Sequence, residues 1–310
     1  MATIKIEIDT ESSNPVSVRP FRTPSWATPP TQGIGIVSSI SYDAKMTTAF
    51  NAGLGLTPTQ AFPPGPLQAY IPPALDDLKF NAQAIQTAIQ QLNADAKIGL
   101  IVTFGGNFTW NVANQFATKP FISLIGSMLP NMQMSAYFAG GVTLDSIEAD
   151  TARINDLVNV KPKVQASNIW LLYDSRTPMA PTEMSNWTGG GVTPATNGIN
   201  DPTKFGLDFG NIPNAAKAVV ISAAPYFLHN REELIAAANT SKLYICYPLL
   251  RYRNADGTNK PTSGVATVLG PDLCEGPINA YSLMGATASN ALFGETNPAL
   301  MHAPQRTVYL

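Results

Sequence analysis

Short apolar runs alternate with longer amphipathic segments along most of the chain. Residues 98–103 form a continuous apolar run that ends at a Gly-Gly pair, which is typical of a buried parallel strand. Between residues 76 and 93, apolar positions recur at steps of three and four with Gln and Asn between them, which predicts an amphipathic helix. Repetition of these two patterns predicts βα units, and therefore parallel sheets with right-handed crossovers.

The same patterns predict elements in both halves of the chain. A break at residues 127–143 separates two βα series, so we predict an α/β protein with two doubly wound parallel-sheet lobes joined by a hinge. A Gly/Asn/Pro-rich insertion is expected at residues 178–202, and residues 57–73 should be irregular apart from a short strand near residues 68–71. Further strands are predicted at residues 33–37, 120–125, 168–173, 218–222, 243–247, 265–269 and 306–310, and further helices at 42–54, 107–117, 144–158, 231–239 and 277–293.

The amino-acid composition of the chain argues against some classes of binding partner. Only 13% of the 310 residues are charged, about half the usual share, yet 45% are hydrophobic, so the chain can bury a core and cover it with a neutral polar surface. The net charge is −2 without a Lys/Arg cluster, which argues against nucleic acid and membrane surfaces as partners. No apolar stretch reaches transmembrane length.

The first twenty residues carry acidic side chains and lack the apolar core of a secretory signal. As the sequence stands we expect a cytoplasmic protein, or a periplasmic one if an export signal has been removed. Residues 1–32 are expected to form an N-terminal arm, with an edge strand at the alternating residues 4–8.

Candidate binding residues follow the predicted strands, because ligands of open α/β sheets bind at the carboxyl ends of the strands. These positions offer hydroxyls, an amide, aromatic rings, glycines and one carboxylate, a set that suits a neutral or zwitterionic small molecule better than a phosphate. They are Ser38, Ser39, Ser41, Phe104, Gly105, Gly106, Asn107, Gly126 and Ser127 in the first lobe, and Asp174, Ser175, Pro225, Tyr226 and Tyr247 in the second.

Each candidate has a structural alternative. Asp174 either binds a ligand amine or caps a turn. Tyr226 and Tyr247 either stack on a ligand ring or pack between the lobes. The Gly105-Gly106-Asn107 segment either presents backbone N–H groups to a ligand carboxylate or forms a plain turn in which Asn107 caps the next helix.

Catalytic motifs are missing from the sequence. It contains no G-x-S-x-G, no H-E-x-x-H, no Walker loop and no complete G-x-G-x-x-G after a strand. His229 and His302 have no catalytic partner nearby in sequence, and Cys246 and Cys274 lack the spacing of a metal site. We therefore expect a protein that is not an enzyme and that needs no cofactor and no metal.

Several segments resemble the substrate-binding proteins of ABC transporters, in particular the group that includes tryptophan/tyrosine-type binders. In the second half these are AVVISAAPYFLHNREELIAAA at residues 218–238, LYICYP at 243–248 and GPDL at 270–273. In the first half they are IGLIVT at 98–103, KPFI at 119–122, GGVT at 140–143 and IWLLYD at 169–174. Their order and spacing are similar to those of the family from about residue 33 to the end.

The resemblance implies a type I periplasmic-binding fold, a clamshell that closes on its ligand. It implies a first lobe of residues 33–128 plus 265–300 and a second lobe of residues 129–264 plus 301–310. It also implies a solute-binding function, with an ABC permease as a candidate partner. The chain departs from the family at Ala224, where an Asp is frequent.

An alternative function remains open. The low charge, the many prolines and the predicted arm and insertion would also suit a structural or interaction protein that keeps the clamshell without ligand binding, as a homo-oligomer.

Overall fold

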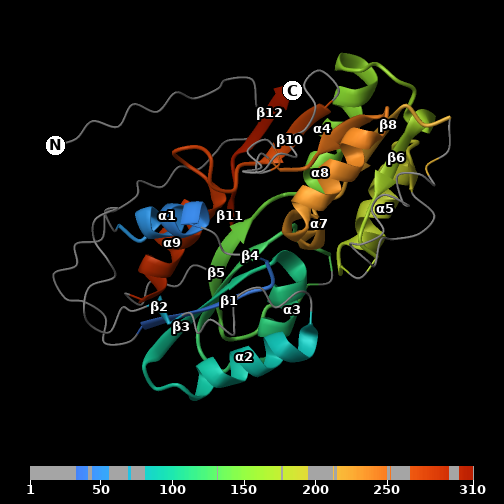
Figure 1. Ribbon diagram of the computed structural model, residues 1–310. Coiled ribbons are helices and arrows are strands. Elements are labelled where there is room, and N and C mark those ends of the chain that lie inside the picture. The colour runs from blue at the N-terminus through green and yellow to red at the C-terminus, as the bar shows by residue number, and fades with distance from the viewer. Residues whose placement is uncertain are drawn as a thin grey trace.

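Two six-stranded sheets organise the chain in the computed structural model (Figure 1). Predictions for the arm, for the strand at residues 4–8 and for Ser41 lie outside the described residues. The structure describes residues 33–40, 44–55, 69–70, 81–130, 132–175, 177–194, 212, 215–249, 252, 266–292 and 300–309.

The first sheet is parallel throughout, in the order β11-β5-β4-β3-β1-β2. Helices α1 and α9 pack together on one face of the sheet, and α2 and α3 pack on the other. The strands are β1 (Gly33–Ser38), β2 (Ala69–Tyr70), β3 (Ile98–Phe104), β4 (Phe121–Ile125), β5 (Phe138–Thr143) and β11 (Leu300–His302), and the helices are α1 (Ala44–Gly53), α2 (Ala82–Ala94), α3 (Gly106–Phe116) and α9 (Ala280–Leu292).

The second sheet has the order β12-β10-β9-β8-β6-β7 and is parallel except for β12, which pairs antiparallel with β10. Its strands are β6 (Ile169–Leu172), β7 (Thr193–Pro194), β8 (Ala218–Ile221), β9 (Tyr244–Tyr247), β10 (Ala266–Pro271) and β12 (Gln305–Tyr309). The accompanying helices are α4 (Glu148–Asn155), the π-helical turn η1 (Asp156–Val160), the short 3-10 helix η2 (Ala166–Asn168), α5 (Ala180–Gly189), α7 (Pro225–His229) and α8 (Arg231–Thr240).

Strand β5 differs from the predicted organisation, in which residues 127–143 form a break before the second lobe. The structure pairs β5 with β4 in the first sheet. Its sequence FAGGVT hides the strand signal because two of its six residues are glycine. Gly141 is required by packing, since a Cβ there would lie 2.1 Å from the Ser123 carbonyl oxygen.

The last part of the chain also crosses between the lobes at positions other than the predicted lobe boundaries, which were residues 265 and 300. Strand β10 belongs to the second sheet, α9 packs on the first, β11 joins the first sheet and β12 returns to the second. The chain thus passes between the lobes twice after residue 266, from β10 to α9 and from β11 to β12, which ties the two lobes together.

Two local predictions are wrong. The insertion predicted at residues 178–202 contains helix α5, which begins with a proline in its first turn, where proline is tolerated. Asn107 does not cap α3. The cap is Gly105, held at a left-handed φ of 116°, and Asn107 lies inside the helix.

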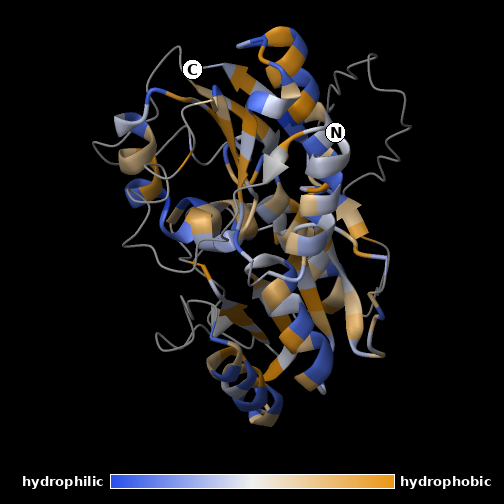
Figure 2. Cartoon of the chain, turned by 90° about the vertical axis from the view of Figure 1, so that its right-hand side faces the viewer, coloured by the Kyte–Doolittle hydropathy of each residue, from blue (hydrophilic) through white to orange (hydrophobic). Residues whose placement is uncertain are grey.

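Alternation along the strands builds three apolar cores. In β3, Leu100 and Val102 pack on the side of α9, whereas Ile101 faces α2 and α3. A separate core lies under α5 in the second lobe and contains Trp187. The core on the α9 side continues without interruption into the second lobe, where it includes Leu228. Figure 2 shows the result, strands that are largely hydrophobic beside helices in which hydrophobic and hydrophilic residues alternate.

Helices α1 and α9 approach closely through glycines, which makes a testable contrast. A Cβ on Gly285 would lie 2.1 Å from the Phe50 carbonyl oxygen, whereas a Cβ on Gly189, in α5, would meet nothing within 4 Å. Gly285→Ala is expected to lower the free energy of unfolding by about 2 kcal/mol or more through overpacking. Gly189→Ala should raise it slightly, because alanine favours a helix. Urea unfolding of both variants checks this, and equal stabilities would contradict it.

Candidate functional site

A small cavity lies between the lobes, where the carboxyl ends of the strands from both sheets meet. Its volume is about 30 Å³, which is enough for about one water molecule. The lining is mostly apolar. The first lobe contributes Ile40, Gly105, Gly106, Asn107, Phe108, Leu124, Gly126 and Leu144, and the second contributes Thr177, Met179, Ala223, Pro225, Leu228 and Leu249. The remaining two are Leu273, between β10 and α9, and Tyr281, in α9.

The lobes touch directly at two glycines. A Cβ on Gly106 would lie 3.1 Å from Cγ of Pro225, and a Cβ on Gly126 would lie 2.4 Å from Sδ of Met179. In both places a side chain of the second lobe lies against bare backbone of the first. Together with the continuous apolar core, these contacts bring the two lobes into direct contact across the cleft.

Five of the predicted binding residues line this cavity. They are Gly105, Gly106, Asn107, Gly126 and Pro225. Gly105 and Gly106 both have left-handed φ angles, at 116° and 69°, and α3 begins directly after Gly105 without a side-chain cap. The first backbone N–H groups of α3 therefore belong to the wall of the cleft.

The predicted polar groups are used mainly to brace the first lobe. The Asn107 side chain donates to the Ser127 carbonyl oxygen at 2.7 Å and accepts from the Gly126 amide at 2.8 Å. Ser38 donates to the Ile40 carbonyl oxygen at 2.6 Å, and Ser39 accepts from Thr109 at 2.8 Å. These side chains fix the loops that shape the cleft.

Ser127 connects the first lobe to α4. Its hydroxyl donates to Glu148 Oε2 and accepts from the Ile147 amide, both at 2.8 Å. This pair of hydrogen bonds therefore links the loop after β4, in the first lobe, to the start of α4, in the second.

The predicted aromatic residues pack inside the protein. Phe104 stacks on Tyr281 with ring centroids 4.6 Å apart, and Tyr247 stacks on Tyr252 at 5.1 Å. Burial raises the pKa of the Tyr247 hydroxyl well above its ordinary value. Tyr226 is buried beside Phe227. Among the predicted aromatic residues none lines the cavity, although Tyr281, the partner of Phe104, does.

The two remaining candidates lie outside the cavity lining. Asp174 is buried, with its carbonyl oxygen accepting from the Thr177 amide and hydroxyl, and Ser175 is exposed. Sequence reasoning missed Met179, which falls in the segment treated as an insertion, and the leucines that close the cavity. Leu124 and Leu249 lie at or near the ends of predicted strands, so a search for apolar as well as polar residues there would have found them, whereas Leu144 follows β5, a strand that was not predicted.

A buried charge cluster lies behind the cleft in the second lobe. Arg153 pairs with Asp150 at 2.7 Å, and both side chains are fully buried. Arg153 also donates to the carbonyl oxygens of Leu269 and Ser146, at 3.1 and 3.0 Å. Glu183, from α5, is 1% exposed and adds a second carboxyl group. One guanidinium thus faces two carboxyl groups.

Burial raises the pKa values of both carboxyl groups. The pKa of Asp150 rises to about 6, although Arg153 opposes the rise. Burial raises the pKa of Glu183 to about 8, and the negative charge of Asp150 adds to the effect. At neutral pH the favoured state therefore has an ionised Asp150 paired with Arg153 and a protonated Glu183.

The described residues contain no helix that is both long and apolar enough to cross a membrane. Within the same residues, no three His, Cys, Asp or Glu side chains come together in a group that could hold a metal ion.

Comparison with known proteins identifies the architecture. No protein-family model matches the chain, and no curated protein matches it in sequence. Solved structures match nearly the whole chain. An ABC domain in complex with L-Trp from Streptococcus pneumoniae has a TM-score of 0.62 and 12% identity, covering 89% of this chain and 91% of that one.

Two further matches are of similar extent. An ABC transporter solute-binding protein from Agrobacterium vitis with bound allitol has a TM-score of 0.57 and 13% identity, over 90% of this chain and 95% of that one. A LacI family transcriptional regulator from Enterococcus faecalis with bound ribose has a TM-score of 0.56 and 11% identity, over 89% and 97%. With its two parallel-sheet lobes and this likeness, the chain has the α/β fold of the type I periplasmic-binding proteins.

Proposed function

We propose that the protein is a clamshell receptor that binds a small, neutral and largely apolar solute between its lobes and has no catalytic activity. The observation that carries this proposal is the cavity at the strand ends, formed by both lobes and walled by Gly105, Gly106 and Gly126. The similar solved structures with bound L-Trp, allitol and ribose support a small-molecule ligand.

The lining argues for a narrower ligand class than the zwitterion that the sequence suggests. The cavity has no ionisable side chain except Tyr281. An apolar body would contact Leu124, Leu144 and Leu228, while one acceptor group would meet the uncapped N-terminus of α3. An aromatic or branched amide, which is neutral and carries a carbonyl acceptor, fits this description better than a doubly charged amino acid.

Binding requires the lobes to open. A cavity of about 30 Å³ is far below the volume of about 300 Å³ or more of typical ligand sites. Met179 is the side chain best suited to move, because methionine is flexible and its sulfur lies against the backbone of Gly126 across the cleft. In the open form its displacement would free space between the two lobes.

A second candidate function rests on the closed cleft itself. If the continuous apolar core keeps the lobes shut, the clamshell serves as a rigid structural or interaction protein, and homo-oligomer contacts replace ligand binding. For the receptor, an ABC permease remains the partner that we propose. The cellular location that we propose for the receptor is the one expected from the sequence, which is the cytoplasm, or the periplasm if an export signal has been removed.

Thermal unfolding separates the two functions. Wild-type protein is melted with aromatic and branched carboxylates, amides, amino acids and nucleosides, while its mass is measured by size exclusion. A receptor should show an upward shift with one ligand class, since saturation at about 100 times Kd adds about 2.7 kcal/mol. Hydrogen exchange with that ligand should protect residues 105–108 and 223–228, and Met179→Ala should change which ligands bind.

The opposite pattern would identify the structural protein. No shift with any compound, together with an oligomeric mass, would overturn the receptor. A shift whose exchange protection avoids residues 105–108 and 223–228 would show that the ligand binds elsewhere on the molecule.

A further inference from the structure

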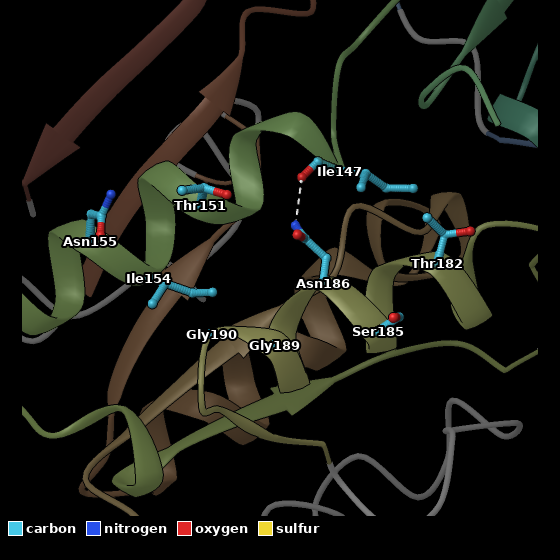
Figure 3. Close-up of a pocket in the computed structure, with 9 residues that line it drawn as sticks. All are labelled: Ile147, Thr151, Ile154, Asn155, Thr182, Ser185, Asn186, Gly189 and Gly190. Carbon is cyan, nitrogen blue, oxygen red and sulfur yellow. Dashed lines mark hydrogen bonds between the residues drawn. The ribbon is translucent and has the colours of Figure 1, made fainter. Parts of the chain in front are cut away.

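A larger cavity lies away from the cleft, on the second lobe, in a groove between α4 and α5 (Figure 3). Its volume is about 620 Å³, within the range of about 300–1,000 Å³ that small-molecule sites occupy. The groove is open to solvent in the same closed structure in which the space between the lobes is filled. It can therefore accept a ligand without a movement of the lobes.

The walls of the groove carry hydrogen-bonding groups without charge. The nine lining residues include the hydroxyls of Thr151, Thr182 and Ser185 and the amides of Asn155 and Asn186, and none of the nine is ionisable. Hydroxyl and amide side chains both donate and accept hydrogen bonds. Such a lining offers no countercharge to a charged ligand that loses its hydration, but it matches a ligand made of neutral hydroxyl groups.

Apolar surface interrupts this polar lining. Ile147 and Ile154 project into the groove from the α4 side (Figure 3). A Cβ on Gly190 would lie 2.6 Å from Cδ1 of Ile154, so this isoleucine lies directly against the backbone at the end of α5. The groove therefore alternates C–H patches with hydroxyl and amide groups.

Interactions beneath the groove hold both walls in place. Arg153 fixes α4 to β10 through the Leu269 carbonyl oxygen, and Trp187 anchors α5 in the core below. Asn186 joins the two helices, because its amide nitrogen donates to the Ile147 carbonyl oxygen at 3.2 Å. A groove whose walls are fixed in this way is preorganised, which lowers the entropic cost of binding.

We propose that the α4/α5 groove binds a neutral polyhydroxylated molecule, a sugar or a polyol, at a site separate from the cleft. Such ligands present hydroxyls at their edges and C–H groups on their faces, and the groove offers complementary groups to both. This site does not depend on the proposed function of the cleft, since the two cavities share no lining residue.

Gly189 allows a clean test. A Cβ there would meet nothing within 4 Å, so the position accepts a side chain; Gly189→Trp adds a large ring to the wall of the groove, and Gly189→Ala is the matched control at the same position. Titration calorimetry with glucose, sorbitol and trehalose is expected to show saturable binding to wild type and to Gly189→Ala. Gly189→Trp should weaken that binding at least tenfold, and Ser185→Ala should weaken it several-fold.

Two further measurements complete the test, namely the affinity of charged sugars and the location of bound glucose on the protein. Glucose 6-phosphate and glucosamine should bind at least tenfold more weakly than glucose, and hydrogen exchange with glucose should protect residues 148–155 and 180–190. Absence of saturable binding up to 10 millimolar, equal binding by Gly189→Trp, or protection confined to residues 105–108 and 223–228 would each overturn the groove site. The last result would leave the cleft receptor intact.

Discussion

Replacing Arg153 with methionine is expected to lower the free energy of unfolding by about 3–5 kcal/mol, the largest effect among the substitutions considered. The guanidinium is the charge partner of fully buried Asp150 and the donor to the Leu269 and Ser146 carbonyl oxygens. Its removal leaves one carboxylate and two backbone acceptors without their donor in the interior. Because Leu269 belongs to β10, the loss also removes the hydrogen bond that links α4 to the second sheet.

A double replacement distinguishes the lost charge pair from lost packing. Arg153→Met combined with Asp150→Leu removes both charges, and replacement of a whole buried pair by apolar side chains is often neutral or stabilising. We therefore expect the double variant to recover most of the stability that the single variant loses in urea unfolding. A single variant within 1 kcal/mol of wild type, or a double variant less stable than the single, would contradict this account.

The alternation of strands and helices in this chain could be predicted from sequence because its central strands are nearly continuous apolar runs. Strands β3, β4, β8 and β9 are buried on both faces, so their sequences carry few polar residues and stand out from the helices. Strand β5 and helix α5 were missed for the opposite reason. Glycines that packing requires in β5, and the glycines and proline around α5, carry the composition of loops.

The candidate site was only partly predictable, because strand ends give a position along the chain but no side-chain direction. The glycines at residues 105, 106 and 126 line the cleft as the strand-end rule indicates. Ser39 and Asn107 come from the same loops, yet their side chains find partners within the first lobe. Whether a loop hydroxyl faces a ligand or a neighbouring loop depends on tertiary contacts that no local pattern encodes.

The buried carboxyl of Glu183 predicts an unusual dependence of stability on pH. Neither carboxyl oxygen has a hydrogen-bond partner of normal geometry among the described residues, although Ser222 and Ala223 lie near enough to oppose the rise in pKa. Because the pKa is about 8 in the folded protein and 4.5 as the ordinary value, the folded state binds more protons between these pH values. Stability should therefore fall as pH rises from about 5 to 8, by up to about 1.4 kcal/mol per pH unit.

Glu183→Gln should remove most of this slope. Glutamine has the shape of the protonated acid and cannot ionise, so the variant should match wild type near pH 5 and exceed its stability by about 3 kcal/mol at pH 8. Asp150 keeps its own raised pKa of about 6 in this variant, so the stability of the variant should still fall by a smaller amount as the pH rises toward 6.

Glu233→Gln, an exposed change on α8, is the control and should keep the wild-type slope of stability against pH. Urea unfolding at pH 5, 6.5 and 8 measures the three profiles. Parallel profiles for wild type and Glu183→Gln would mean that Glu183 is ionised in the folded protein, with Arg153 shared between two carboxylates.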